Sequence, residues 1–69
     1  MEKTNTTKIL EIIQRMSPRF DAIPVYDICD EAEQAGINTN ETVMILGKLS
    51  LHGEIFYPRH GLIKLVTKR

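Results

Sequence analysis

NTNETVMILGKLSLHG, the stretch from Asn38 to Gly53, carries the signals that begin, support and end one helix. Asn38 is a preferred N-cap residue, and Glu41 lies three residues later, where its side chain can reach back to free backbone amides. Gly53 follows the last helical position, where a left-handed residue often ends a helix. One face is apolar at helical spacing, and it consists of Thr42, Ile45, Leu46 and Leu49.

Two short β-type runs follow this helix directly. They cover residues 54–57 and 62–66, and the sequence Pro58-Arg59-His60-Gly61 between them is short enough for a tight hairpin. A helix that runs straight into a hairpin is typical of the second half of a winged helix-turn-helix domain. We therefore predict an α+β fold in which three helices pack with a small antiparallel hairpin, the wing.

Two further helices are expected upstream. The first should run from near Thr6 to Met16, where Ser17-Pro18 ends it, because the residue before proline disfavours helix. The second should span residues 25–35, with Pro24 at its start and Gly36 at its end. The predicted inner faces are Ile9, Ile12, Ile13 and Met16 in the first helix and Val25, Ile28, Cys29 and Ala32 in the second.

The connections between these helices complete the pattern. A turn of three to four residues that contains Gly36 is typical of a helix-turn-helix, and Ile37 should be buried at its corner. Between the first two helices, either Phe20 or Ile23 should enter the core, and Ala22-Ile23 is the candidate for a short third strand. We predict a single domain over residues 1–69, with 1–6 flexible and 67–69 forming a basic tail.

Composition limits the class of protein. The chain has 69 residues, 42% of them hydrophobic, and one cysteine, Cys29, which allows no internal disulfide. It has no apolar run near the roughly 18 residues that a membrane span needs, and its start does not resemble a signal peptide. These features favour a soluble domain in a reducing, cytoplasmic setting, without a membrane partner.

Motifs for catalysis are not found in the sequence. Gly47-Lys48 lacks the earlier glycine and the following Ser or Thr of a phosphate-binding loop. Cys29, His52 and His60 fall on different elements without metal-ligand spacing. We predict no catalytic residues, no metal and no cofactor, and we interpret Cys29 as a buried, inert thiol.

The charges are segregated although the net charge is zero. Residues 1–41 hold four basic and eight acidic residues, and residues 42–69 hold five basic residues and one acid, so the two parts carry −4 and +4. This segregation is either a chance distribution of solvated charges or a sign that the basic end faces an anionic or acidic partner.

Candidate binding residues lie on the third helix and on the wing. The outward face of the helix offers one fixed cation and two apolar side chains, which is poor for reading bases. We predict weak nucleic-acid contact that is not sequence-specific, through Lys48, Arg59, His60, Lys64 and Lys68. The alternative is that the wing charges are solvated and protect an edge strand. Met44 and Leu51 are candidates for contact with a protein, unless they pack against the domain's own loops or strands.

The last third of the sequence resembles the end of archaeal minichromosome maintenance (MCM) replicative helicases. The resemblance rests on Gly53-Glu54-Ile55, Tyr57-Pro58-Arg59, Gly61 and Ile63, and it extends over most of residues 8–66. In that family a small C-terminal winged helix follows the ATPase domain. The resemblance implies a non-catalytic, regulatory part of a hexameric, ATP-dependent DNA helicase. Implied partners are the other domains of the parent helicase, origin-recognition initiator proteins and DNA, and the isolated fragment is expected to be monomeric.

Two other functions remain compatible with the sequence. One is a stand-alone winged-helix transcription regulator that binds DNA as a dimer. The other is a protein-interaction winged helix of the replication machinery that uses Met44, Leu51 and the wing.

Overall fold

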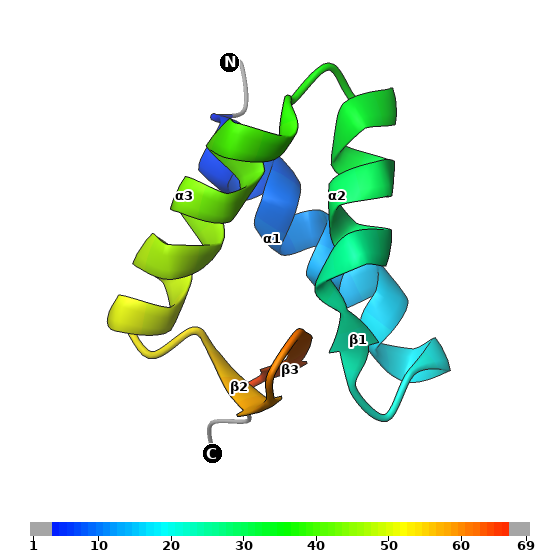
Figure 1. Cartoon of the computed structure of the whole chain (residues 1–69), viewed down its shortest axis with the longest axis vertical. Coiled ribbons are helices and arrows are strands. Elements are labelled where there is room, and N and C mark those ends of the chain that lie inside the picture. The colour runs from blue at the N-terminus through cyan, green and yellow to red at the C-terminus, as the bar shows by residue number, and fades with distance from the viewer. Residues whose placement is uncertain (1–3, 67–69) are drawn as a thin grey trace.

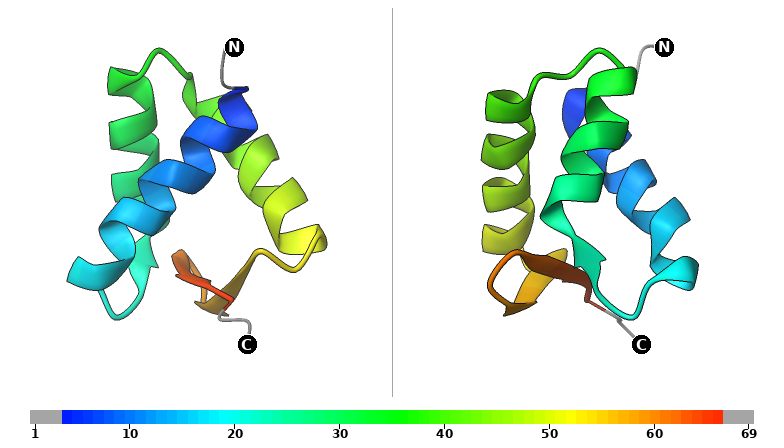
Figure 2. Two further views of the ribbon diagram at one scale, coloured as in Figure 1. Left: turned by 180° about the vertical axis from the view of Figure 1, so that it is seen from behind. Right: turned by 45° about the vertical axis from the view of Figure 1, so that its right-hand side comes forward.

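The computed structural model describes residues 4–66, which form three helices, one short 3-10 turn and three strands. In chain order they are α1 (Asn5–Met16), η1 (Ser17–Arg19), β1 (Ile23–Pro24), α2 (Val25–Gln34), α3 (Thr39–Leu51), β2 (Ile55–Arg59) and β3 (Leu62–Leu65). In Figure 1, α2 and α3 stand next to each other and α1 crosses behind both. The view from behind confirms this crossing and places the small sheet at one end of the helices (Figure 2). The arrangement is that of the predicted winged helix-turn-helix.

The sheet has the strand order β1-β3-β2 and is antiparallel throughout. Ile23 pairs with Ile63, so the third strand that we expected at Ala22-Ile23 is confirmed, one residue further along. The strand β2 is longer than predicted and continues through Arg59, which leaves His60-Gly61 as the connection. The pairing register shifts between Phe56 and Arg59. This irregularity explains how β2 includes a proline, because Pro58 has no N–H to donate to the ladder.

The core is one apolar cluster to which all three helices and all three strands contribute. The predicted face of α3 is buried in full, and Ile37 at the helix-turn-helix corner is 2% exposed. Ile23 is buried and Phe20 packs against the cluster in part, so both alternatives contribute. The buried apolar residues are Ile9, Ile12, Ile13, Ile23, Ile28, Ala32, Ile37, Ile45, Leu46, Leu49, Ile55 and Ile63.

The helices α2 and α3 end with the same hydrogen-bond pattern at their C-termini. After α2, Ile37 N–H donates to Ala32 O at 2.9 Å and Gly36 N–H donates to Glu33 O at 3.0 Å. After α3, Glu54 N–H donates to Leu49 O at 2.9 Å in the same way. This motif needs a residue with positive φ, and Gly36 (φ +88°) supplies it for α2. The turn therefore orients α3 against α2 through backbone geometry.

The start of the chain differs from the prediction. The helix α1 begins at Asn5, because Thr4 caps it: its hydroxyl oxygen accepts the Thr7 N–H at 3.1 Å. Thr4 to Thr6 thus form the capped start of α1, and the flexibility expected over 1–6 stays a prediction. Residues 1–3 and the predicted basic tail, 67–69, lie outside the described residues. Within residues 4–66, no helix is long and apolar enough to cross a membrane.

Candidate interaction surfaces

Two of the predicted wing cations share one shallow hollow on the hairpin. Arg59 and Lys64 line it together with Asp21 and Pro58, and its volume is about 440 Å³. The Lys64 Nζ atom lies 3.8 Å from Asp21 Oδ1, so a carboxylate already shares this cation. The Asp21 side chain is fully exposed, so water and salt screen this pair and it adds little to stability. The hairpin therefore offers a small cationic site whose charge Asp21 reduces.

The turn of the hairpin is bonded to the start of α2. The Val25 N–H donates to Gly61 O at 2.9 Å, which continues the β1–β3 pairing by one step. One of the backbone amides that the first turn of a helix leaves free is satisfied in this way. His60, the nucleic-acid-binding candidate at the turn, is exposed beside this bond. The wing is thus held against α2 by its own backbone at the turn.

The outward face of α3 is exposed as predicted. Met44 is 66% exposed and Leu51 is 84% exposed, which rules out the alternative that they pack inside this domain. Val43, 52% exposed, is a further apolar residue on the same helix that the sequence reasoning missed. Lys48 is exposed, and it is the one basic residue of α3. Glu41 lies in the first turn, where its charge opposes a phosphate.

The nucleic-acid candidates are therefore only partly brought together. Arg59 and Lys64 share a site, His60 lies at the adjoining turn, and Lys48 comes from α3. Lys68, the fifth candidate, lies outside the described residues. Few cations face a common direction, so this surface fits weak contact with phosphate better than recognition of bases.

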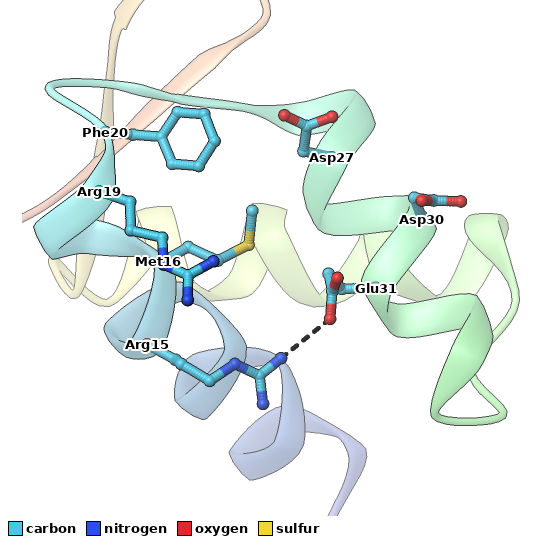
Figure 3. Close-up of a pocket in the computed structure, with 7 residues that line it drawn as sticks. All are labelled: Arg15, Met16, Arg19, Phe20, Asp27, Asp30 and Glu31. Carbon is cyan, nitrogen blue, oxygen red and sulfur yellow. Dashed lines mark hydrogen bonds and ion pairs between the residues drawn. The ribbon is translucent and has the colours of Figure 1, made fainter.

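A second hollow, of about 250 Å³, lies between α1 and α2 and was not predicted (Figure 3). Arg15 Nη2 and Glu31 Oε1 form an ion pair of 2.9 Å across it. Asp27 and Asp30 also line the hollow, but their carboxylates point away from this pair (Figure 3). Sequence gives no local signal for the pair, because its members are 16 residues apart on different helices. We interpret it as a structural contact between α1 and α2.

No cluster in the described part of the chain is arranged for metal binding. Within residues 4–66, no group of three or more His, Cys, Asp or Glu side chains could hold a metal ion. The three carboxylates beside the hollow of Figure 3 diverge, and two arginines share that space.

Cys29 is only partly buried, whereas we predicted a buried, inert thiol. It lies on the side of α2 that borders α3, where Val43 and Glu33 line the same groove. Burial raises the pKa of the Cys29 thiol above its ordinary value, and the negative charge of Glu33 raises this pKa further. The thiol therefore stays protonated at neutral pH, and the protonated form is the unreactive one.

We expect iodoacetamide to alkylate Cys29 severalfold more slowly at pH 8 than it alkylates a cysteine in an unstructured peptide. Replacing Glu33 by Gln removes the nearby negative charge, so the pKa of Cys29 should fall and its reaction should become faster. The matched variant Glu41→Gln on α3 should leave the rate unchanged. Mass spectrometry of timed samples measures these rates. A wild-type rate equal to that of the peptide would contradict the raised pKa.

Comparison with known proteins identifies one relative. The chain is 32% identical over 65 residues to an uncharacterized MCM-type protein of the archaeon Methanocaldococcus jannaschii. The matched segment covers 94% of this chain, so it includes nearly all of the fold described above. No family model matches the chain, and no solved structure matches it.

The similarity indicates a relation between this chain and an MCM-type protein. The chain spans about a tenth of the length of that curated relative. The family resemblance proposed from the wing sequence is thus supported at the level of an MCM relation.

Proposed function

We propose that the chain acts as a non-catalytic winged-helix domain that regulates an MCM-type, hexameric and ATP-dependent replicative DNA helicase. The observation that carries this proposal is the similarity over 94% of the chain to a small part of an MCM-type protein. A domain of this size with a complete core of its own fits a module attached to a larger enzyme. Its role would be to modulate the ATPase and unwinding activities of the ring, in the cytoplasm at the nucleoid.

The surfaces support regulation through protein contacts rather than through reading of a DNA sequence. The helix α3 carries one basic residue, whereas DNA-reading helices present several donors to base edges. Val43, Met44 and Leu51 on α3 are exposed apolar side chains suited to contact with protein. Arg59 and Lys64 on the hairpin would add weak contact with the DNA backbone. Proposed partners are the other domains of the helicase and origin-recognition initiator proteins, with the isolated chain a monomer.

Removal of this segment from an MCM-type helicase that contains it tests the proposal. ATPase and fork-unwinding rates should change severalfold while hexamers, measured by light scattering, persist. Rates equal to those of the intact enzyme would contradict a regulatory role. Complete loss of ATP hydrolysis in intact hexamers would contradict a non-catalytic one.

A protein-interaction domain of another replication complex is the second candidate. The exposure of Met44 and Leu51 favours it. Shift mapping of the labelled chain with candidate replication proteins distinguishes the two, because this function predicts signals at both residues without any helicase ring. The stand-alone transcription regulator is the weaker alternative, since α3 offers one fixed cation for a duplex.

A further inference from the structure

The helix α2 has an unusually acidic surface. It carries four acidic residues, Asp27, Asp30, Glu31 and Glu33, and no basic residue. Glu31 is paired with Arg15 of α1. Asp30 and Glu33 form no ion pair or hydrogen bond with another side chain within residues 4–66. Two negative charges are therefore left unneutralised on the part of α2 that borders α3.

A groove of about 500 Å³ runs between α2 and α3 at this position. Its lining on α2 extends from Val25 to Glu33, and Thr39 and Val43 line it from the first half of α3. Figure 1 shows these two helices next to each other. Its apolar lining comes from Val25 and Cys29 on the α2 side and Val43 on the α3 side. Tyr26, 83% exposed, adds an aromatic ring at the end near the hairpin turn. Volumes of 300–1,000 Å³ with mainly apolar walls are typical of binding sites.

We propose that this groove binds a basic amphipathic helix of a partner protein. Apolar side chains on one face of such a helix would contact Val25, Cys29 and Val43, as helices dock into grooves through residues at i, i+3 or i+4 and i+7. Lysine or arginine side chains beside that face would pair with Asp30 and Glu33. The docking would neutralise two charges that this domain leaves without a partner.

The negative charge of the groove favours a basic partner helix over nucleic acid or a second copy of the chain. Nucleic acid would be repelled, because Asp30 and Glu33 would meet its phosphates. A second copy of the chain offers no suitable helix among those described, since its basic residues are spread over α1, η1, α3 and the hairpin. The inference goes beyond the proposed function and does not depend on a helicase parent, because it rests on the groove alone.

The test uses the full, ¹⁵N-labelled chain and two synthetic peptides of 18 residues. Both peptides carry leucines at helical i, i+4, i+7 and i+11 positions. The first has lysines beside the leucine face, and the second has glutamates at the same places. At 50 mM salt, the lysine peptide should shift the amide signals of Tyr26, Cys29, Glu33 and Val43 and should bind at least tenfold more tightly than the glutamate peptide.

Variants then assign the binding to the groove. The pair Asp30→Asn and Glu33→Gln should weaken binding of the lysine peptide about 3- to 10-fold, and by less in 500 mM salt. The matched pair Asp21→Asn and Glu41→Gln, with the same change in net charge, should stay within twofold.

One substitution probes the apolar wall of the groove. Val43→Asp should weaken binding more than tenfold, whereas Met44→Asp, the next residue along α3, should stay within twofold. Both positions are more than half exposed, and thermal melts check that both variants fold.

Several results would overturn the proposal. These are equal binding of the two peptides, no binding of either, or shifts centred on Met44, Leu51 and the hairpin. Groove signals that move with protein concentration alone would point to a second copy instead, and stronger shifts from a 20-base-pair duplex would point to DNA. None of these results bears on the effect of deleting the domain from a helicase, so the two proposals fail separately.

Discussion

Truncating Ile63 to alanine is expected to lower the free energy of unfolding by about 2–5 kcal/mol. Ile63 is fully buried in the central strand β3, and it lies opposite Ile23 of β1. The substitution leaves a cavity where the sheet meets the helices. A chain of this length has a total stability of about 3–10 kcal/mol, at 0.05–0.15 kcal/mol per residue. The expected loss is therefore a large fraction of the total stability.

Urea unfolding followed by circular dichroism measures this loss. Leu51→Ala is the control, because it also truncates a large aliphatic side chain but at a position that is 84% exposed. It should change the free energy of unfolding by no more than about 0.5 kcal/mol. Equal losses of unfolding free energy in the two variants would show that the Ile63 side chain of β3 does not contribute to the core.

Substitutions at two glycines are expected to change the stability of the fold in opposite directions. Gly36→Val should destabilise the fold by about 1–2 kcal/mol, because Gly36 has φ +88° and a β-branched residue is strained there. Gly47→Ala should stabilise it by about 0.5–1 kcal/mol, because Gly47 lies within α3 and alanine is a better helix former. Nothing lies within 4 Å of a Cβ added at Gly47.

Thermal unfolding of the two variants beside the wild type checks this pair. The melting temperature should fall with Gly36→Val and rise with Gly47→Ala. A stable Gly36→Val variant would mean that the turn between α2 and α3 does not need the left-handed residue. Loss of stability with Gly47→Ala would mean that the outward face of α3 is not open.

The fold was largely predictable because its signals are local. Asn38 accepts the Glu41 N–H at 2.8 Å through its side chain, so the N-cap of α3 is confirmed. The apolar spacing of α1 and α3 predicted their buried faces, and Gly36 and Gly53 marked the ends of α2 and α3. The third strand could be located because Ile23 was an apolar residue isolated between two helices.

The features that the sequence did not reveal depend on which faces of different elements meet. Periodicity gave Cys29 an inward direction, but it is only partly buried and lines the groove between α2 and α3 together with Val43. The contact of Lys64 with Asp21 and the bond from Val25 to Gly61 join segments that are far apart in the chain. Pro58 and Arg59 were expected in the turn, whereas an irregular pairing admits both to the edge strand β2.

The sequence predicted which residues of the candidate surfaces are available for contact better than it predicted how they are arranged in space. Exposure of Lys48 and Arg59 followed from the helical wheel and the hairpin pattern, whereas the sequence left open whether Met44 and Leu51 pack within the domain. The acidic groove did not, because its walls come from two helices and its charges all come from one of them.

Titration of the 69-residue chain against fluorescent 20-base-pair duplexes of unrelated sequence tests the central claim, that this winged helix does not read DNA sequence by itself. We predict weak binding, with dissociation constants no tighter than the 10⁻⁴–10⁻⁶ M that is typical of non-specific contact at physiological salt. All duplexes should bind alike, and the logarithm of affinity should fall with the logarithm of salt concentration by a slope of about −3 or less in magnitude, since few cations are available. Nanomolar binding to one sequence with discrimination against the others would contradict the claim.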